Sequence, residues 1–153
     1  AGIGSRETPE TVLNQMYRIA IMLQTDGWWL SAGGARGADT AFERGAGIQR
    51  RIFKAQDATP DAMVLAKKYH PAWSRCTATA RALHARNGMI LLGHDLVDPV
   101  KFVVCWTPDG KATGGTGQAL RIAVDPQYAI PVFNLFFPTA EKTMADYLTS
   151  LVW

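Results

Sequence analysis

The sequence predicts a single α/β domain spanning all 153 residues (1–153), with a doubly wound, mainly parallel sheet and helices on both faces. Three observations lead to this fold class. Short apolar runs alternate with helical patterns along the chain. The run at 100–106 is almost wholly apolar, which is typical of a central strand in a parallel sheet. Finally, three glycine-bearing turns each follow an expected strand and open an expected helix.

In the N-terminal part, turn and cap residues set the expected boundaries. Thr8-Pro9-Glu10 is typical of a helix start, with Thr8 as the N-cap and Pro9 at the first helical position. Asp26-Gly27 is expected to end that helix. The expected elements are a strand at 1–4, a helix from 9 to about 25, a strand at 28–32, a helix from 38 to about 49 and a strand at 51–55.

The C-terminal part continues the alternation. Thr59 and Thr139 are expected to cap helices, and Pro71 is expected to separate two helices. The expected elements are helices at 62–69 and 72–88, a loop at 94–99, a strand at 100–106, a turn at 108–110, a helix at 118–123, a strand at 130–135 and a helix to about 151.

The composition indicates a folded protein and suits an anionic ligand. Hydrophobic residues make up 48% of the chain and charged residues 19%, which predicts a folded core rather than disorder. The net charge of +3 suits an anionic ligand without requiring a nucleic acid. No apolar run reaches the roughly 18 residues of a membrane span, so we expect no membrane association. Because the chain starts directly on a strand end at Ala1, we also expect residues before it.

Cysteine and histidine show no pattern of a metal centre or disulfide framework. Cys105 lies in an apolar run and is expected in the core, while Cys76 has no partner at a ligand spacing. His70, His84 and His94 are interpreted as surface or core residues. We therefore expect no metal, no cofactor and a reduced, cytoplasmic environment.

The glycine turns indicate a phosphate site. In parallel α/β sheets, ligands bind beyond the carboxyl ends of the strands, where all three turns are expected to lie. Their unpaired amides and the adjoining helix N-termini favour an anion. The candidate ligand-binding residues are Gly4, Ser5 and Arg6 in the first turn; Gly33, Gly34, Arg36, Gly37 and Asp39 in the second; and Gly114, Gly115, Thr116, Gly117 and Gln118 in the third.

Each candidate also has a purely structural interpretation. The first turn is equally a tight strand-to-helix connection with a solvated Arg6, and the third a glycine-rich surface loop. Asp39 is either a helix cap or an acceptor for a ribose hydroxyl. Arg86 and Asn87 lie at the expected C-terminal end of a helix, where a cation favours the helix dipole, although contact with a phosphate or base is the alternative.

These segments resemble a known superfamily. The stretch Ser31–Asp39 is similar to the SGGARGID-type segment of the DNA processing protein A family. Arg86-Asn87-Gly88-Met89, followed by Gly114–Gly117, resembles the R-x-x-M and PGGxGT segments of the Lonely Guy phosphoribohydrolases. Both belong to the SLOG superfamily of Rossmann-like nucleotide-binding domains, and the resemblance extends from Gly2 to about Leu135. Small proteins of this kind are encoded by bacteria and phages, so the resemblance implies the cytoplasm of a bacterial or phage-infected cell.

The resemblance implies a nucleotide or nucleoside monophosphate as ligand, with hydrolysis of its N-glycosidic bond as one activity. The alternatives are a single-stranded DNA-binding module and a nucleotide-signal sensor without catalysis. Arg86 matches the family's catalytic Arg, but the position of the family's Glu falls on Arg121 and that of the motif's Thr on Gln118. Catalysis therefore needs a carboxylate from another turn, for which Glu7 and Asp39 are the candidates, and enzymatic activity is left open.

The resemblance also implies a homo-oligomer, a dimer or larger. Phe136, Phe137 and Trp153 are the apolar residues expected to be partly exposed for such contacts, with completion of the core as their alternative role.

Overall fold

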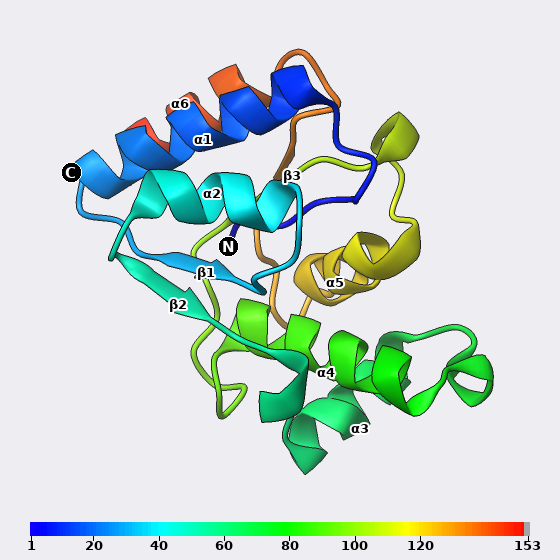
Figure 1. The fold of residues 1–153 in the computed structure, drawn as a ribbon. Coiled ribbons are helices and arrows are strands. Elements are labelled where there is room, and N and C mark those ends of the chain that lie inside the picture. The colour runs from blue at the N-terminus through cyan, green and yellow to red at the C-terminus, as the bar shows by residue number, and fades with distance from the viewer. Residues whose placement is uncertain (152–153) are drawn as a thin grey trace.

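Helices make up most of the chain, and short parallel strands lie between them (Figure 1). The computed structural model describes residues 1–151. Its helices are α1 (Glu10–Thr25), α2 (Ala38–Ala46), α3 (Pro60–Tyr69), α4 (Ala78–Leu92), α5 (Gly114–Val124) and α6 (Ala140–Ser150). Its strands are β1 (Leu30–Ala32), β2 (Arg50–Ile52), β3 (Val103–Cys105) and β4 (Val132–Asn134). Single 3₁₀ turns occupy η1 (Ala55–Asp57), η2 (Trp73–Arg75) and η3 (Pro108–Gly110).

The strands form two parallel pairs, β1 with β2 and β3 with β4. The first residues of the chain hydrogen-bond to both pairs. The Gly2 amide donates to the Ser31 carbonyl of β1 at 3.0 Å, and the Val104 amide of β3 donates to the Ala1 carbonyl at 2.9 Å. The predicted first strand is therefore present as a single parallel bridge between Gly2 and Val104.

Apolar residues of the strands alternate between two core clusters. Val103 and Cys105 pack with residues of α3, α4 and α5, whereas Val104 packs with residues of α1, α2 and α6. This alternation follows from the two-residue period of a strand. Figure 1 shows the same division, with α1, α2 and α6 on one side of the strands and α3 and α4 on the other. As predicted, Cys105 is fully buried, and burial raises the pKa of its thiol to about 12.

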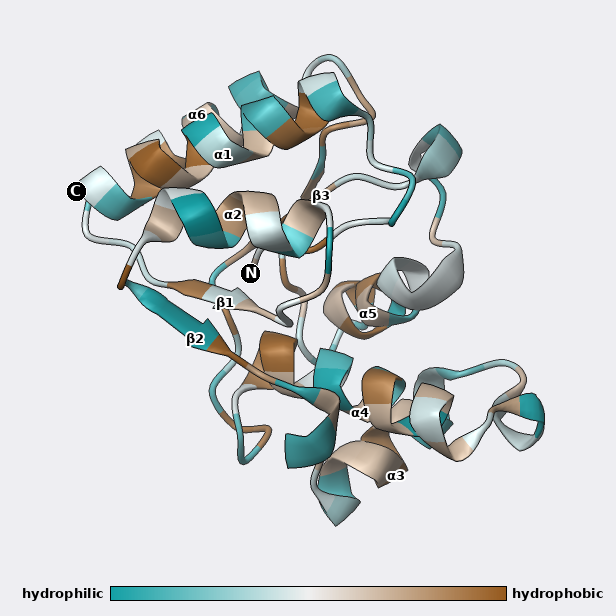
Figure 2. Cartoon of the chain, in the orientation of Figure 1, coloured by the Kyte–Doolittle hydropathy of each residue, from teal (hydrophilic) through white to brown (hydrophobic). Residues whose placement is uncertain are grey.

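The strand β2 is more hydrophilic than its neighbour β1 (Figure 2). Its Arg50 and Arg51 are exposed, and it pairs with β1 on one side only. Charged side chains on such an edge hinder pairing with a second molecule. No helix within residues 1–151 has the combination of length and apolarity that crossing a membrane requires.

The boundaries of α4 differ from the prediction, and the difference changes the position of Arg86. Thr77 caps α4, because its hydroxyl accepts from the Ala80 amide at 3.1 Å, so the helix begins at Ala78 rather than 72. The helix then continues to Leu92 and ends at Gly93, where φ is +80°. Arg86 thus lies inside the helix, and the explanation through the helix C-terminus was wrong.

Of the three predicted threonine caps, one is confirmed. The Thr59 hydroxyl accepts from the Ala62 amide at 3.2 Å at the start of α3. Thr8 does not cap α1; its hydroxyl donates to the Ser5 carbonyl at 2.6 Å, and Pro9 holds the cap position. Thr139 stands at the cap of α6 with a nearly helical backbone, and its side chain accepts no amide there.

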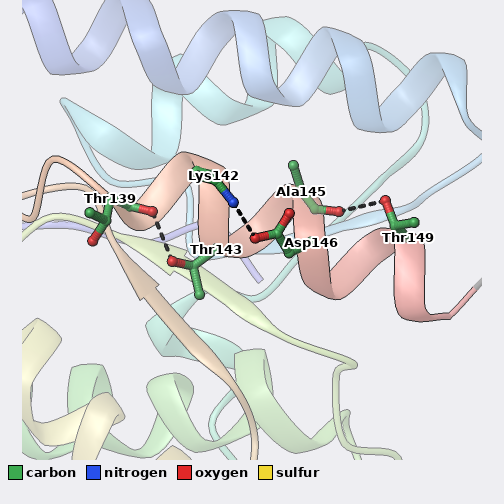
Figure 3. A network of polar contacts seen from close by, with 6 residues as sticks. All are labelled: Thr139, Lys142, Thr143, Ala145, Asp146 and Thr149. Atoms are coloured by element: carbon green, nitrogen blue, oxygen red, sulfur yellow. Dashed lines mark hydrogen bonds and ion pairs between the residues drawn. The ribbon is translucent and has the colours of Figure 1, made fainter.

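Close polar contacts instead run along the exposed side of α6 (Figure 3). The hydroxyls of Thr143 and Thr149 donate to the carbonyls four residues earlier, at 2.8 and 2.9 Å. Lys142 and Asp146 form an ion pair at 2.7 Å with both side chains exposed, so it contributes little to stability.

The packing of α1 on α2 yields a first prediction. A Cβ at Gly45 of α2 would lie 2.5 Å from both the Ala20 Cβ and the Tyr17 carbonyl oxygen of α1. We therefore expect Gly45→Ala to lower the free energy of unfolding by roughly 1–3 kcal/mol. In the control Gly115→Ala, the new Cβ would meet nothing within 4 Å, so stability is expected to hold or rise slightly. Urea denaturation followed by circular dichroism measures both, and equal stability of Gly45→Ala and the wild type would contradict the helix contact.

Candidate functional site

A cavity of about 560 Å³ lies where the three glycine turns meet. Of the residues predicted from the sequence, those that line it are Gly4, Ser5, Arg6, Glu7, Gly33, Gly34, Arg36, Asp39, Arg86, Asn87, Gly114, Gly115 and Thr116. Gly37, Gly117 and Gln118 are not part of its lining. The three turns are thus brought together from stretches of the chain up to about a hundred residues apart.

Two charged side chains hydrogen-bond to the backbone of Gly33 in the second turn. The Asp39 Oδ2 atom accepts from the Gly33 amide at 3.0 Å and from the Ala35 amide at 3.3 Å. The Arg86 Nη1 atom donates to the Gly33 carbonyl at 2.5 Å. A Cβ on residue 33 would overlap this guanidinium, so a larger residue there would displace Arg86 from the Gly33 carbonyl. Asp39 therefore stabilises the turn before α2, while its predicted contact with a ribose hydroxyl stays a prediction.

Burial dominates the ionisation of both side chains. Asp39 is 5% exposed and Arg86 is 9% exposed. Burial raises the pKa of Asp39, and the Ala35 amide, the Arg86 charge and the Gly33 amide oppose this only in part. Burial likewise lowers the pKa of Arg86, and the charge of Asp39 opposes it. In each residue, loss of water outweighs the attraction of the other residue's charge.

The Arg86 guanidinium keeps donor capacity beside the cavity. Its Nη1 atom is used by Gly33, whereas its Nε atom is buried without a hydrogen-bond partner among residues 1–151. Buried donors of this kind normally have a partner, so the site is suited to a bound acceptor. A guanidinium binds phosphate or carboxylate oxygens in a two-point fashion.

The third turn opens α5 instead of preceding it. Gly114, Gly115 and Thr116 form the first helical turn, where backbone amides have no carbonyl partner within the helix. Asn87 of α4 fixes this turn, because its Nδ2 atom donates to the Gly115 carbonyl at 3.1 Å. Gly114 has φ of +65°, which favours glycine, and a Cβ at either glycine would meet nothing within 4 Å. The face of this turn toward the cavity is therefore open.

Gly117 and Gln118, the next two residues of the motif, pack in the protein interior and do not line the cavity. A Cβ on Gly117 would overlap the backbone of Ala112, so this glycine permits close packing of the preceding loop. Gln118 is completely buried, and neither of its side-chain polar atoms has a partner within the described chain. We find no structural account of that unpaired amide group.

Positive charge exceeds negative charge around the cavity. Its lining cations are Arg6, Arg36, Lys54 and Arg86, and its lining carboxylates are Glu7 and Asp39. Asp39 is already bonded to two amides. The other lining carboxylate, Glu7, is exposed, and its side chain has no hydrogen-bond partner among residues 1–151. The cavity is therefore electrostatically suited to an anion.

Two lining residues with titratable side chains were missed by the sequence prediction, Lys54 and His84. Lys54 lies two residues beyond the end of β2, whereas it was predicted to lie inside the expected strand at 51–55. The pKa of His84 is lowered by burial and then by the nearby charges of His70, Arg121 and Arg86. The structure also brings His84 together with His70 and Cys76, which were interpreted separately from the sequence.

Two of the three residues expected to form oligomer contacts lie within the described part of the chain. Phe136 and Phe137 are 41% and 49% exposed and lie edge to face with ring centres 5.4 Å apart. Trp153 lies outside the described residues. Formation of a homo-oligomer stays a prediction.

Comparison of the chain with protein-family models, with curated proteins and with solved structures finds no match in any of the three.

The burial of Asp39 predicts a pH-dependent difference in stability. Because its pKa is higher in the folded than in the unfolded protein, the folded state binds the proton more tightly. As the pH falls from 7 toward about 4, where an unfolded Asp titrates, the wild type should gain unfolding free energy relative to Asp39→Asn. The Asn variant keeps an acceptor oxygen for both amides and removes the charge. Urea denaturation of both proteins across this range measures the difference, and parallel or opposite pH profiles would contradict it.

Proposed function

We propose that this chain binds a nucleotide or a related phosphorylated small molecule in the cavity between the three glycine turns. The observation that carries the proposal is the convergence of those turns on one cavity with an excess of cations. Its volume of about 560 Å³ lies within the roughly 300–1,000 Å³ typical of small-molecule sites.

The proposed phosphate position is in front of the first turn of α5. The amides of Gly114, Gly115 and Thr116 supply donors there, and the helix dipole adds partial positive charge. Arg86 lies on the α4 side of the same cavity, and Arg6 and Arg36 are exposed on its rim. The remaining volume is left for the sugar and base.

We also propose that the strands act as one doubly wound, Rossmann-like sheet in the order β2, β1, residues 1–3, β3, β4. The hydrogen bonds of Gly2 to β1 and of Val104 to Ala1 support this order. The chain then runs outward from the central segment to β2 and returns to β3 on the other side. Ligands of such sheets bind at the carboxyl ends of the strands where the direction reverses, between the first and third turns of this chain. This arrangement fits the resemblance to the SLOG superfamily.

Hydrolysis of the N-glycosidic bond is a second candidate function, and the position of Glu7 favours it. Glu7 and Arg86 line the same cavity. Arg121, at the place of the family's catalytic Glu, instead donates to the carbonyls of Tyr69 and Ala112. In the proposed step, Glu7 takes a proton from water, the oxygen bonds to the anomeric carbon, and the base departs with the electrons of the broken bond and gains a proton.

The binding proposal predicts a strong dependence on phosphate and on the rim arginines. We expect nucleoside monophosphates to bind at least about 10-fold more tightly than their nucleosides. Arg36→Ala and Arg6→Ala are each expected to weaken binding about 10-fold, or about 1.4 kcal/mol. Arg18→Ala removes the same charge from α1 away from the cavity and serves as the control. Isothermal titration calorimetry with monophosphates of the common bases measures these affinities.

Equal affinity for nucleosides and nucleotides would contradict the proposed phosphate site. An equal loss of affinity in all three arginine variants would contradict it too. The DNA-binding alternative makes a different prediction. Tight binding of a single-stranded oligonucleotide that falls steeply with salt, without affinity for monophosphates, would favour that alternative.

Catalysis by Glu7 is tested separately from binding. Base release from each monophosphate is followed by chromatography, with Glu7→Gln as the variant and Glu10→Gln, on α1 outside the cavity lining, as the control. We expect Glu7→Gln to lower kcat by about 100-fold or more while nucleotide affinity is retained. If the wild type binds monophosphates but releases no base, catalysis by Glu7 is contradicted and the binding proposal stands.

A further inference from the structure

A second group of chemically reactive side chains gathers beside the cavity, around the connection from α3 to α4. His70 follows the last residue of α3, Cys76 directly precedes the cap of α4, and His84 lies on α4 itself. Their potential ligand atoms all lie within 4.8 Å of one another, and all three residues are half-buried. Cys76 Sγ is 3.6 Å from His70 Nε2, and the two imidazole rings have centres 4.4 Å apart.

We propose that His70, Cys76 and His84 bind one zinc ion. Bond lengths of about 2.0–2.1 Å to nitrogen and 2.3 Å to sulfur place tetrahedral N and S ligands roughly 3.5 Å apart. The separation of Cys76 Sγ and His70 Nδ1, 3.8 Å, is close to that value. One thiolate with two imidazoles is also a donor set that zinc accepts readily.

The hydrogen bonds of the cluster leave ligand atoms that a metal can use. His84 Nδ1 is buried and has no partner among residues 1–151, which is unusual for a buried polar atom. His70 Nδ1 accepts from the Ala72 amide at 3.1 Å, so this nitrogen carries a lone pair in the metal-free protein. Binding through that nitrogen exchanges one neutral hydrogen bond for a zinc–nitrogen bond after a rotation of the ring.

Charge and protonation are also compatible with zinc. Binding uses uncharged imidazoles and a Cys76 thiolate. Arg86 and Arg121 place positive charge near His84, which opposes a bare cation. Loss of the Cys76 proton to solvent on binding offsets this, because the thiolate cancels one of the two charges of the ion. A site with three protein ligands keeps a fourth position for water or an anion.

The zinc proposal does not depend on the proposed nucleotide function, although His84 belongs to the cluster and also lines the cavity. The test uses the full chain after removal of metals with a chelator. Cobalt titration reports the ligands through its thiolate charge-transfer and tetrahedral d–d absorption, and competition with a chromophoric chelator gives the zinc affinity. We expect one ion per chain and an absorption band characteristic of cobalt–thiolate bonding.

Cys76→Ser is expected to abolish the thiolate band and to weaken zinc binding by more than the roughly 10–100-fold that loss of a supporting residue costs. His84→Asn should weaken zinc binding to a similar degree and keeps the test decisive if the serine variant does not fold. Cys105→Ala and His94→Ala remove a thiol and an imidazole outside the cluster and should bind as the wild type does. Circular dichroism verifies folding of each variant. Absence of the thiolate band in the wild type, or equal zinc affinity of the wild type and both cluster variants, would overturn the proposal.

Discussion

The backbone of Gly33 is held by two buried charged side chains, and the form of the cavity depends on this arrangement. Asp39 on α2 accepts from its amide, and Arg86 on α4 donates to its carbonyl. These helices pack into different core clusters, so the two bonds join both helical layers at the end of β1. A further bond from the Ser31 hydroxyl to the Ile90 carbonyl, at 2.6 Å, strengthens the connection between β1 and α4. The turn is thereby fixed before any ligand arrives.

Holding this turn with two charged side chains costs free energy, because both are removed from water. Burial shifts the pKa of each partner against its charged form, so the pair is not a simple stabilising ion pair. Buried charges with shifted pKa values cluster at functional sites of proteins. In this chain they fix a glycine turn and a guanidinium beside one cavity. The Asn87 bond to Gly115 fixes the third turn in the same way. Rigid donors bind an anion more tightly because little order is lost on binding.

The sequence was sufficient where local chemistry determines the structure, and insufficient where distant segments meet. Glycine turns after apolar runs correctly indicated three neighbouring loops, because the ends of parallel strands share a rim. Arg86 was misplaced at a helix end because α4 continues past the expected end at 88 to Leu92. Its contact with Gly33, 53 residues away, is not visible in the local sequence. Gly115 and Gly117 look equivalent in the sequence, yet only the packing of Ala112 shows that Gly117 serves the interior. The cluster of His70, Cys76 and His84 was missed for the same reason: the turn at Trp73–Arg75 brings together residues whose spacing matches no common metal pattern.

The most direct test of a shared anion site is a titration of inorganic phosphate into the ¹⁵N-labelled chain, followed by amide NMR. If the three turns form one site, the signals of Arg6, Gly34 and Gly115 shift together along a single binding curve, while those of Gly27 and Gly47, at the far ends of α1 and α2, do not. Separate affinities for the three turns, or shifts confined to one of them, would contradict the account.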